Sequence, residues 1–91
     1  MALDYPKGVV AVYDNGGKTV DRYTVYYSRR LMQPVPGFYC GRGMSHNPTH
    51  PQGVGMFISG SRGRHNGKRI RWRKLPAECR NVVKDDLKGL A

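Results

Sequence analysis

A short turn between two β-branched segments constrains the fold of this chain more than any other feature. Residues 8–13 and 18–27 are rich in valine, threonine and tyrosine, and the segment 14–17 between them is Asp-Asn-Gly-Gly. Asn15 and Gly16 accept the positive φ angles of a two-residue primed turn, whose twist matches that of antiparallel strands. The pattern therefore predicts a β-hairpin. Neither face of its second strand is cleanly polar, which places that strand inside a sheet.

The chain after the hairpin alternates between loop-like and strand-like segments. Pro34 and Pro36 remove backbone donors from residues 28–37, so we expect a loop there and not a regular ladder. Glycines at positions 60, 63 and 67 indicate a second irregular segment after the fourth strand. The sequence predicts strands at 38–44 and 54–58, loops at 45–53 and 59–67, and a last strand at 68–73.

The predicted last strand has two different faces. Ile70 and Trp72 alternate with Arg69, Arg71 and Arg73. This two-residue period is typical of a strand that is buried on one side and exposed on the other. Side chains on one face of a strand are about 7 Å apart, close to the spacing of phosphates along a nucleic-acid strand. The three arginines should form one exposed basic stripe.

A helix is predicted at the end of the sequence. Leu75-Pro76 opens it, because proline at a helix start loses only a donor that has no partner there, and Glu78 favours the positive end of the helix dipole. Gly89 should end it. Its apolar stripe comprises Cys79, Val82, Val83 and Leu87. We therefore expect one α+β domain over residues 1–91, with an antiparallel, curved or half-closed sheet of about four to five strands and one C-terminal helix.

Positive charge dominates the composition and is unevenly placed. The chain has 16 lysines and arginines against 6 acidic residues, a formal net charge of +10. The excess gathers where arginines, a glycine-rich loop and an aromatic residue are interleaved, a combination typical of nucleic-acid contact. Solvated residues that only keep the protein soluble are the alternative reading. The predicted nucleic-acid-binding residues are Arg62, Arg64, Lys68, Arg69, Arg71, Arg73 and Lys74, with exposed tyrosines such as Tyr26 or Tyr39 as stacking partners for bases.

Motifs for catalysis or cofactors are incomplete. The segment 16–19, Gly-Gly-Lys-Thr, looks like the end of a phosphate-binding loop, but Val12 stands where that loop needs glycine, and no helix follows. Two cysteines and two histidines, Cys40, His46, His50 and Cys79, could form a tetrahedral zinc site, yet the usual Cys-x-x-Cys pair is absent. A Cys40–His46 nucleophile pair lacks an orienting group. The sequence thus predicts no enzyme activity, no cofactor and no metal.

The cellular setting follows from what the chain does not contain. The N-terminal residues have no basic region followed by an apolar run, and no stretch of 18 apolar residues occurs. We expect a cytoplasmic protein with no membrane partner and two reduced thiols.

Two segments carry a resemblance to other proteins. Asp-Asn-Gly-Gly-Lys-Thr-Val-Asp-Arg-Tyr-Thr-Val at 14–25 and Met-Ser-His-Asn-Pro-Thr-His-Pro-Gln-Gly at 44–53, with Leu-Pro-Ala-Glu at 75–78, resemble a group of small hypothetical proteins of phages and prophages. The resemblance covers most of the chain but departs at 28–37 and 62–74. It implies a phage setting, and hence the host cytoplasm, without implying a reaction.

Two functional hypotheses follow. The first is a small basic protein that binds the nucleic-acid backbone without catalysis. The second is a phage inhibitor that binds a host defence or regulatory protein through the 44–53 loop and the 14–19 turn; a rigid connector between strands is the alternative reading of that loop. The predicted partner-binding residues are Asp14, Asn15, Lys18, Ser45, His46, Asn47, His50 and Gln52.

Overall fold

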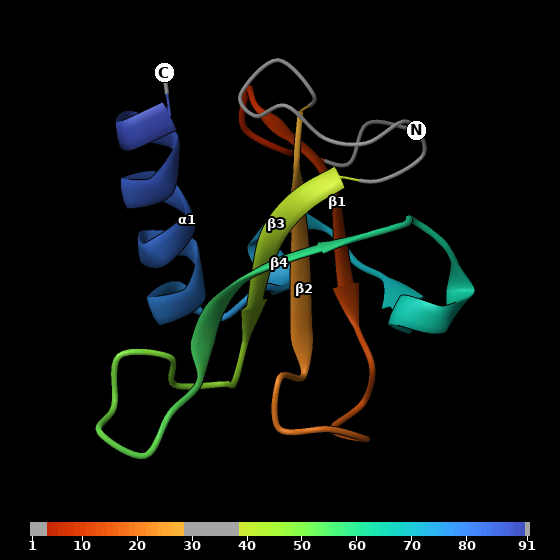
Figure 1. Cartoon of the computed structure of the whole chain (residues 1–91), viewed down its shortest axis with the longest axis vertical. Helices are drawn as coiled ribbons and strands as arrows, with labels where there is room; N and C mark the ends of the chain where they lie inside the picture. Colours follow the sequence, from red (N-terminus) through yellow and green to blue (C-terminus); the bar gives the residue numbers. More distant parts are fainter. Residues whose placement is uncertain (1–3, 29–38, 91) are drawn as a thin grey trace.

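A computed structural model describes residues 4–28 and 39–90. It contains an antiparallel sheet with one helix packed on one face (Figure 1), which confirms the predicted α+β fold class. The expected loop at 28–37 lies outside the described residues except for Ser28. The elements are β1 (Val9–Asp14), β2 (Tyr23–Tyr27), β3 (Tyr39–Met44), β4 (Gly55–Gly60), the 3₁₀ turn η1 (Arg64–Asn66), β5 (Lys68–Arg69), the 3₁₀ turn η2 (Trp72–Lys74) and α1 (Ala77–Leu90).

The five strands form an open sheet in the order β4-β3-β2-β1-β5, with antiparallel neighbours throughout. β2 lies in the middle and all of its residues are buried, which confirms that the second hairpin strand is internal. β5 returns to the free edge of β1. The segment 61–67 therefore passes from one edge of the sheet to the other, over the face that α1 does not cover.

The hairpin forms, but its predicted two-residue turn is wrong. Regular pairing stops at Asp14 opposite Tyr23, and residues 15–22 form a longer loop. The positive φ angles occur at Gly16 and Gly17 and not at Asn15. The reason lies in the side chains before them: Asp14 accepts a hydrogen bond from Gly16 N at 2.7 Å, and Asn15 Oδ1 accepts one from Gly17 N at 2.9 Å. These local bonds replace ladder bonds and lengthen the loop.

The predicted strand at 68–73 is also shorter than expected. Only Lys68 and Arg69 pair with β1, and the chain then leaves the sheet and forms η2. Tyr5 donates its hydroxyl hydrogen bond to Ile70 O at 2.7 Å, and Asp4 accepts from Trp72 N at 3.0 Å, so these backbone groups have partners without a ladder. The alternation of burial nevertheless holds: Ile70 and Trp72 are half-buried, and the three arginines are exposed.

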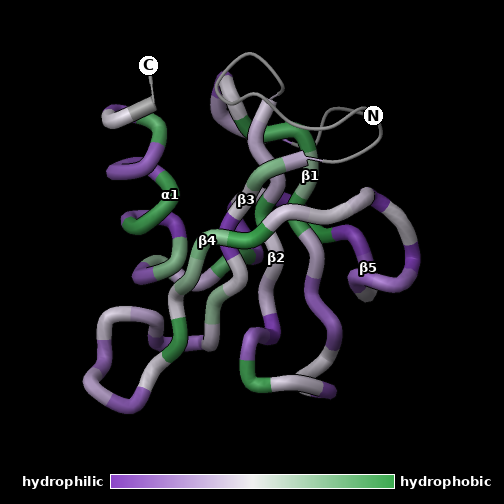
Figure 2. Tube along the Cα trace, in the orientation of Figure 1, coloured by the Kyte–Doolittle hydropathy of each residue, from purple (hydrophilic) through white to green (hydrophobic). Residues whose placement is uncertain are grey.

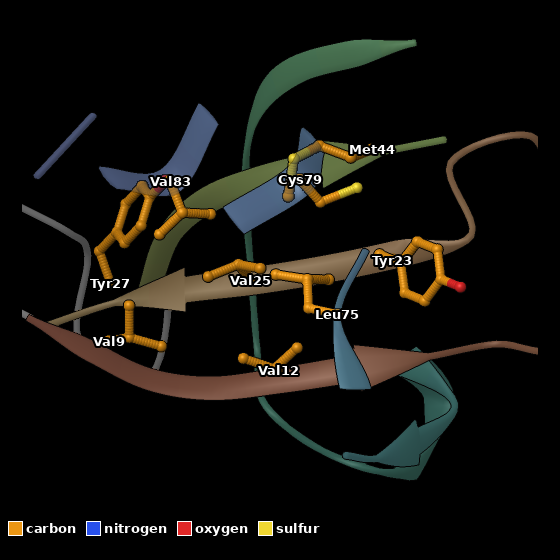
Figure 3. Close-up of a cluster of buried hydrophobic side chains, with 9 residues drawn as sticks. All are labelled: Val9, Val12, Tyr23, Val25, Tyr27, Met44, Leu75, Cys79 and Val83. Atoms are coloured by element: carbon orange, nitrogen blue, oxygen red, sulfur yellow. The ribbon is translucent and has the colours of Figure 1, made fainter. Parts of the chain in front are cut away.

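The main core lies between α1 and the sheet (Figure 3). Cys79 and Val83 of the predicted apolar stripe are fully buried, and Val82 and Leu87 pack against the same cluster, which confirms the stripe. The helix starts where Pro76 O accepts from Arg80 N at 3.0 Å. It continues through Gly89 to Leu90, so the prediction that Gly89 ends it is wrong. An exposed glycine in a last turn weakens a helix without stopping it.

Candidate nucleic-acid interface

All seven predicted phosphate-contacting side chains are exposed. They lie along one continuous segment that first crosses the sheet face not covered by α1 and then borders β1, and this segment is hydrophilic up to β5 (Figure 2). We call this set the basic run. Its members are Arg62, Arg64 in η1, Lys68 and Arg69 in β5, Arg71, and Arg73 and Lys74 in η2.

A close backbone contact at Gly67, between Arg64 and Lys68, holds the middle of the basic run against the end of β1. Gly67 has φ of 106°, and a Cβ atom there would lie 2.4 Å from Asp14 O and 2.6 Å from Asn15 Cα. Only glycine fits, since it has no Cβ and tolerates positive φ. Lys68 then pairs with Asp14. The structure thus brings the basic run next to the 14–19 turn, two regions that the sequence analysis treated separately.

Arg69 is anchored as well as exposed. Its Nη2 donates to Val10 O at 3.0 Å, its Nε donates to the Tyr5 hydroxyl at 3.3 Å, and its Cζ lies 5.6 Å from the centre of the Tyr5 ring. These contacts fix the N-terminal segment to the sheet edge. Substitution of Arg69 would therefore disturb packing as well as charge.

Arg62 lies beside tyrosines. Its Cζ is 5.8 Å from the centre of the Tyr39 ring. Partial burial lowers the pKa of Arg62, but hydrogen bonding with the Tyr13 and Tyr39 phenols raises it more, so the net shift is upward. The guanidinium keeps its charge on the sheet face that α1 leaves uncovered.

The prediction that Tyr26 is an exposed stacking partner is wrong. Tyr26 is only 2% exposed, because it lies on the central strand, and its ring packs edge-on against Tyr13 with ring centres 6.1 Å apart. Its hydroxyl donates to Asn66 Oδ1 at 2.9 Å. Tyr39 is half-buried, with its ring centre 6.2 Å from that of Tyr26. The rings of Tyr13, Tyr26 and Tyr39 pack together on the second face of the sheet, the face that α1 does not cover.

Among the residues that the structure describes, two carboxylates form ion pairs with arginines outside the basic run. Asp14 accepts from Arg22 Nε at 2.8 Å and Nη2 at 3.1 Å. The hydrogen bond from Arg22 lowers the pKa of Asp14, although partial burial opposes the shift. Asp86 pairs with Arg42 Nη2 at 2.5 Å. These two acids are therefore neutralised without using charges of the basic run.

The Arg42–Asp86 pair belongs to a buried network that sequence reasoning missed. Arg42 Nε also donates to Asp86 at 2.9 Å, the Tyr27 hydroxyl donates to the same carboxylate, and Arg42 Cζ lies 4.0 Å from the centre of the Phe57 ring. Burial and this carboxylate both raise the pKa of Tyr27. The hydrogen bond with Asp86 raises the pKa of Arg42. The network ties α1 to β2 and β3 and is structural.

The residues of the second hypothesis come from the end of β1 and from two loops at the same end of the sheet, the lower end in Figure 1. Tyr23 joins the two loops: Arg22 Cζ lies 5.2 Å from its ring centre, and the His46 ring lies 6.2 Å from it. Asp14 and Asn15 are half-buried. Ser45 is buried, and its Oγ accepts from Val54 N at 2.8 Å, so it holds the loop closed. The exposed members are Lys18, His46, Asn47, His50 and Gln52.

The loop at 45–53 has internal hydrogen bonds. His50 N donates to Asn47 O at 3.1 Å, and Gly53 N donates to His50 O at 2.8 Å. Ser45 N donates to Val54 O at 2.7 Å at the base of the loop. The backbone is therefore held in one shape, as the two prolines of this segment indicate.

Both cysteines are free thiols. Cys79 is fully buried, as predicted, and its thiol donates to Ser45 O at 3.2 Å. Burial, assisted by the Glu78 charge, raises the pKa of Cys79 to about 12, so this thiol stays protonated at neutral pH. Within residues 4–28 and 39–90, no three histidine, cysteine or acidic side chains gather where they could hold a metal ion.

Comparison with family models, with curated proteins and with solved structures finds no match to this chain. In the part of the chain that the structure describes, no helix has the length and hydrophobicity needed to cross a membrane.

Proposed function

We propose that this protein binds nucleic acid through its phosphate backbone, without catalysis, in a phage setting. The observation that carries the proposal is the basic run: seven exposed cationic side chains on one continuous segment. Each lysine or arginine that meets a phosphate releases condensed counterions, which drives binding without reading base sequence. A net charge of +10 also raises the local concentration of polyanions around the molecule.

The placement of the run adds a second support. Its residues sit on β5, two 3₁₀ turns and a short connection, and Gly67 and Arg69 hold this segment against β1. The backbone of such a frame loses little conformational entropy on binding, so the cost of ordering falls on the charged side chains alone. Phosphate contacts can therefore form without rearrangement of the sheet.

The test is fluorescence anisotropy with a labelled mixed-sequence oligonucleotide at about 50 and 200 mM salt. We expect affinity to fall steeply with salt, because log K falls by about 0.7 to 0.9 per phosphate contact per decade of salt. The double variant Arg73→Gln/Lys74→Gln should bind more weakly and show a shallower slope. The matched control Gln52→Glu/Met56→Glu removes the same two units of net charge at exposed positions in the β3–β4 loop and on β4, the sheet edge opposite β5. It should bind almost as the parent protein does.

Three results would contradict the proposal: no binding at either salt concentration, an affinity independent of salt, or equal losses in the two double variants. Circular dichroism of each variant establishes that the fold is retained, since all four substituted side chains are exposed.

The alternative, binding of a host protein, has one observation in its favour. The Tyr23 ring lies between Arg22 of the 15–22 loop and His46 of the 45–53 loop, and the exposed polar side chains of both loops lie at one end of the sheet. A tagged protein incubated with nuclease-treated host lysate should then retain a partner. The variant His46→Ala/His50→Ala should lose that partner, whereas Arg73→Gln/Lys74→Gln should keep it. The reverse pattern would exclude these loops as the contact surface.

A further inference from the structure

Charge is segregated on the two flanks of α1. Glu78 accepts a hydrogen bond from Thr49 in the β3–β4 loop at 3.3 Å, and Asp86 pairs with Arg42 on β3. Arg80, Lys84 and Lys88 follow one another at four-residue intervals and so lie along one stripe of the helix. Lys84 and Lys88 are exposed, and Arg80 is half-buried.

The basic stripe faces the side on which the basic run lies. Residues two apart on a helix point in nearly opposite directions, about 200° around the axis, so Arg80 points away from Glu78 and from β3. The segment 70–75 lies on that other side, because Ile70 N donates to Val12 O of β1 at 2.9 Å. In Figure 3, Leu75 lies between Cys79 and β1. The stripe on α1 and the cations of η2 therefore border one surface.

This surface offers charges, whereas the aromatic rings beside it, Tyr5, Tyr39 and Trp72, are half-buried. Among the residues that the structure describes, the large hydrophobic side chains that are exposed are Val20, Met56 and Phe57. Val20 is in the 15–22 loop, and the other two are on β4, at the sheet edge opposite β5. Trp72, the aromatic residue within the basic run, packs against the core. Proteins that bind single strands combine a basic groove with exposed aromatic rings on which bases stack.

We propose that α1 extends the basic run with Arg80, Lys84 and Lys88, and that the combined surface binds a nucleic-acid duplex in preference to a single strand. This inference rests on the proposed function. A duplex presents about one negative charge per 1.7 Å of its axis and releases more counterions per contact than a single strand, about 0.9 against 0.7. At about 1.5 Å per residue, the stripe from Arg80 to Lys88 extends the charged surface by about 12 Å.

The experiment compares three labelled probes at one salt concentration: a 20-base-pair DNA duplex, a 20-base-pair RNA duplex of the same sequence, and single-stranded poly-dT of 20 nucleotides. We expect both duplexes to bind at least about tenfold more tightly than poly-dT, which corresponds to about 1.4 kcal/mol. The variant Lys84→Gln/Lys88→Gln should bind the duplexes several-fold more weakly and reduce the salt slope by about 1 to 2, near 0.9 per lost contact. Gln52→Glu/Met56→Glu is again the control with equal loss of charge.

Each outcome decides the inference. Tighter binding of duplex, weakened by the α1 variant and not by the control, supports it. Equal or tighter binding of poly-dT overturns the duplex preference and leaves the proposed function intact. Unchanged duplex binding by the α1 variant would show that α1 is not part of the binding surface. No binding of any probe overturns the proposed function itself, and the inference with it.

Discussion

The two faces of the sheet are stabilised in different ways. The face under α1 carries a cluster of nine buried residues: Val9, Val12, Tyr23, Val25, Tyr27, Met44, Leu75, Cys79 and Val83. On the other face, the described residues form a cluster of three buried hydrophobic side chains, Ala11, Tyr13 and Tyr26, under the 61–67 segment. Burial of a large apolar side chain contributes about 1.5 to 3 kcal/mol. The first face therefore supplies most of the hydrophobic stabilisation, and the second depends more on hydrogen bonds.

The two faces also differ in how far their polar side chains are shielded from water. On the α1 face, the side chains of Asp86 and Arg42 are only 8% and 15% exposed, so an ion pair is enclosed beside the apolar core. On the second face, Asn66 reaches Tyr26 from a loop in which Arg62, Arg64 and His65 are exposed to water. A lost partner should cost more where water cannot replace it.

The largest effect is expected from Asp86→Ala. Removal of this carboxylate leaves the Arg42 guanidinium and the Tyr27 hydroxyl without their shared partner in an enclosed site. Breaking a buried pair by removing one member costs about 3 to 5 kcal/mol. Urea unfolding monitored by tryptophan fluorescence measures the loss.

The neighbouring residue provides the control. Asp85 is exposed on the same helix, so Asp85→Ala should change stability by no more than about 0.5 kcal/mol. The double variant Arg42→Met/Asp86→Leu removes both charges and should recover part of the stability. Similar losses for Asp86→Ala and Asp85→Ala would show that the network does not stabilise the α1 face.

A smaller effect is expected from Asn66→Ala on the second face. Asn66 accepts from the Tyr26 hydroxyl at 2.9 Å and donates to Ser61 O at 2.9 Å and to Gly63 O at 3.2 Å. Its loss leaves the buried hydroxyl without a partner, at a cost of about 1 to 3 kcal/mol. The same urea titration measures it.

A double-mutant cycle with Tyr26→Phe isolates the hydrogen bond. If it stabilises the second face, the double variant should be less destabilised than the sum of the two single variants. Additive losses would mean that the face is held by apolar packing alone, and the contrast between the two faces would disappear.

Local sequence patterns predicted which strands and helix form better than they predicted the residues at which these elements end. The hairpin, the internal position of β2 and the apolar stripe of α1 follow from side-chain periodicity, which neighbouring residues determine. The turn after Asp14 and the early end of β5 depend on side-chain hydrogen bonds and on Asp4 and Tyr5, which contact residues more than 60 positions away. Alternation also could not show whether Tyr26 is exposed, because both faces of β2 are buried.

Some features of the candidate interface could likewise be predicted from the sequence, and others could not. Exposure of the basic run follows from sequence, since arginine and lysine are rarely buried without partners. The roles of Arg42 and Asp86 do not, because these residues are 44 positions apart. The four-residue spacing of Arg80, Lys84 and Lys88 is visible in the sequence, but its meaning depends on which flank of α1 faces β3.

The smallest effect is expected from substitution of Asp14, the last residue of β1. The Arg22 hydrogen bond lowers the pKa of Asp14 below the value of about 3.9 that is usual in unfolded chains. A carboxylate with a lowered pKa in the folded state stabilises the fold above its unfolded pKa, and this contribution is lost as pH falls through the folded pKa. Asp14→Asn keeps an acceptor for Gly16 N but removes the charge. Because the Arg22 side chain is 39% exposed and solvent screens the pair, the difference between parent and variant should be at most about 1 kcal/mol at pH 6. It should become smaller as the pH falls below about 3.9 and through the lowered pKa of folded Asp14, and also in about 1 M salt. Urea midpoints of the parent protein and the variant at pH 6 and at pH 3 give this difference. The other carboxylates are present in both proteins, so their protonation cancels in the comparison. A difference that grows as the pH falls would have the wrong sign for this ion pair and would assign the role of Asp14 to its bond with the turn amide alone.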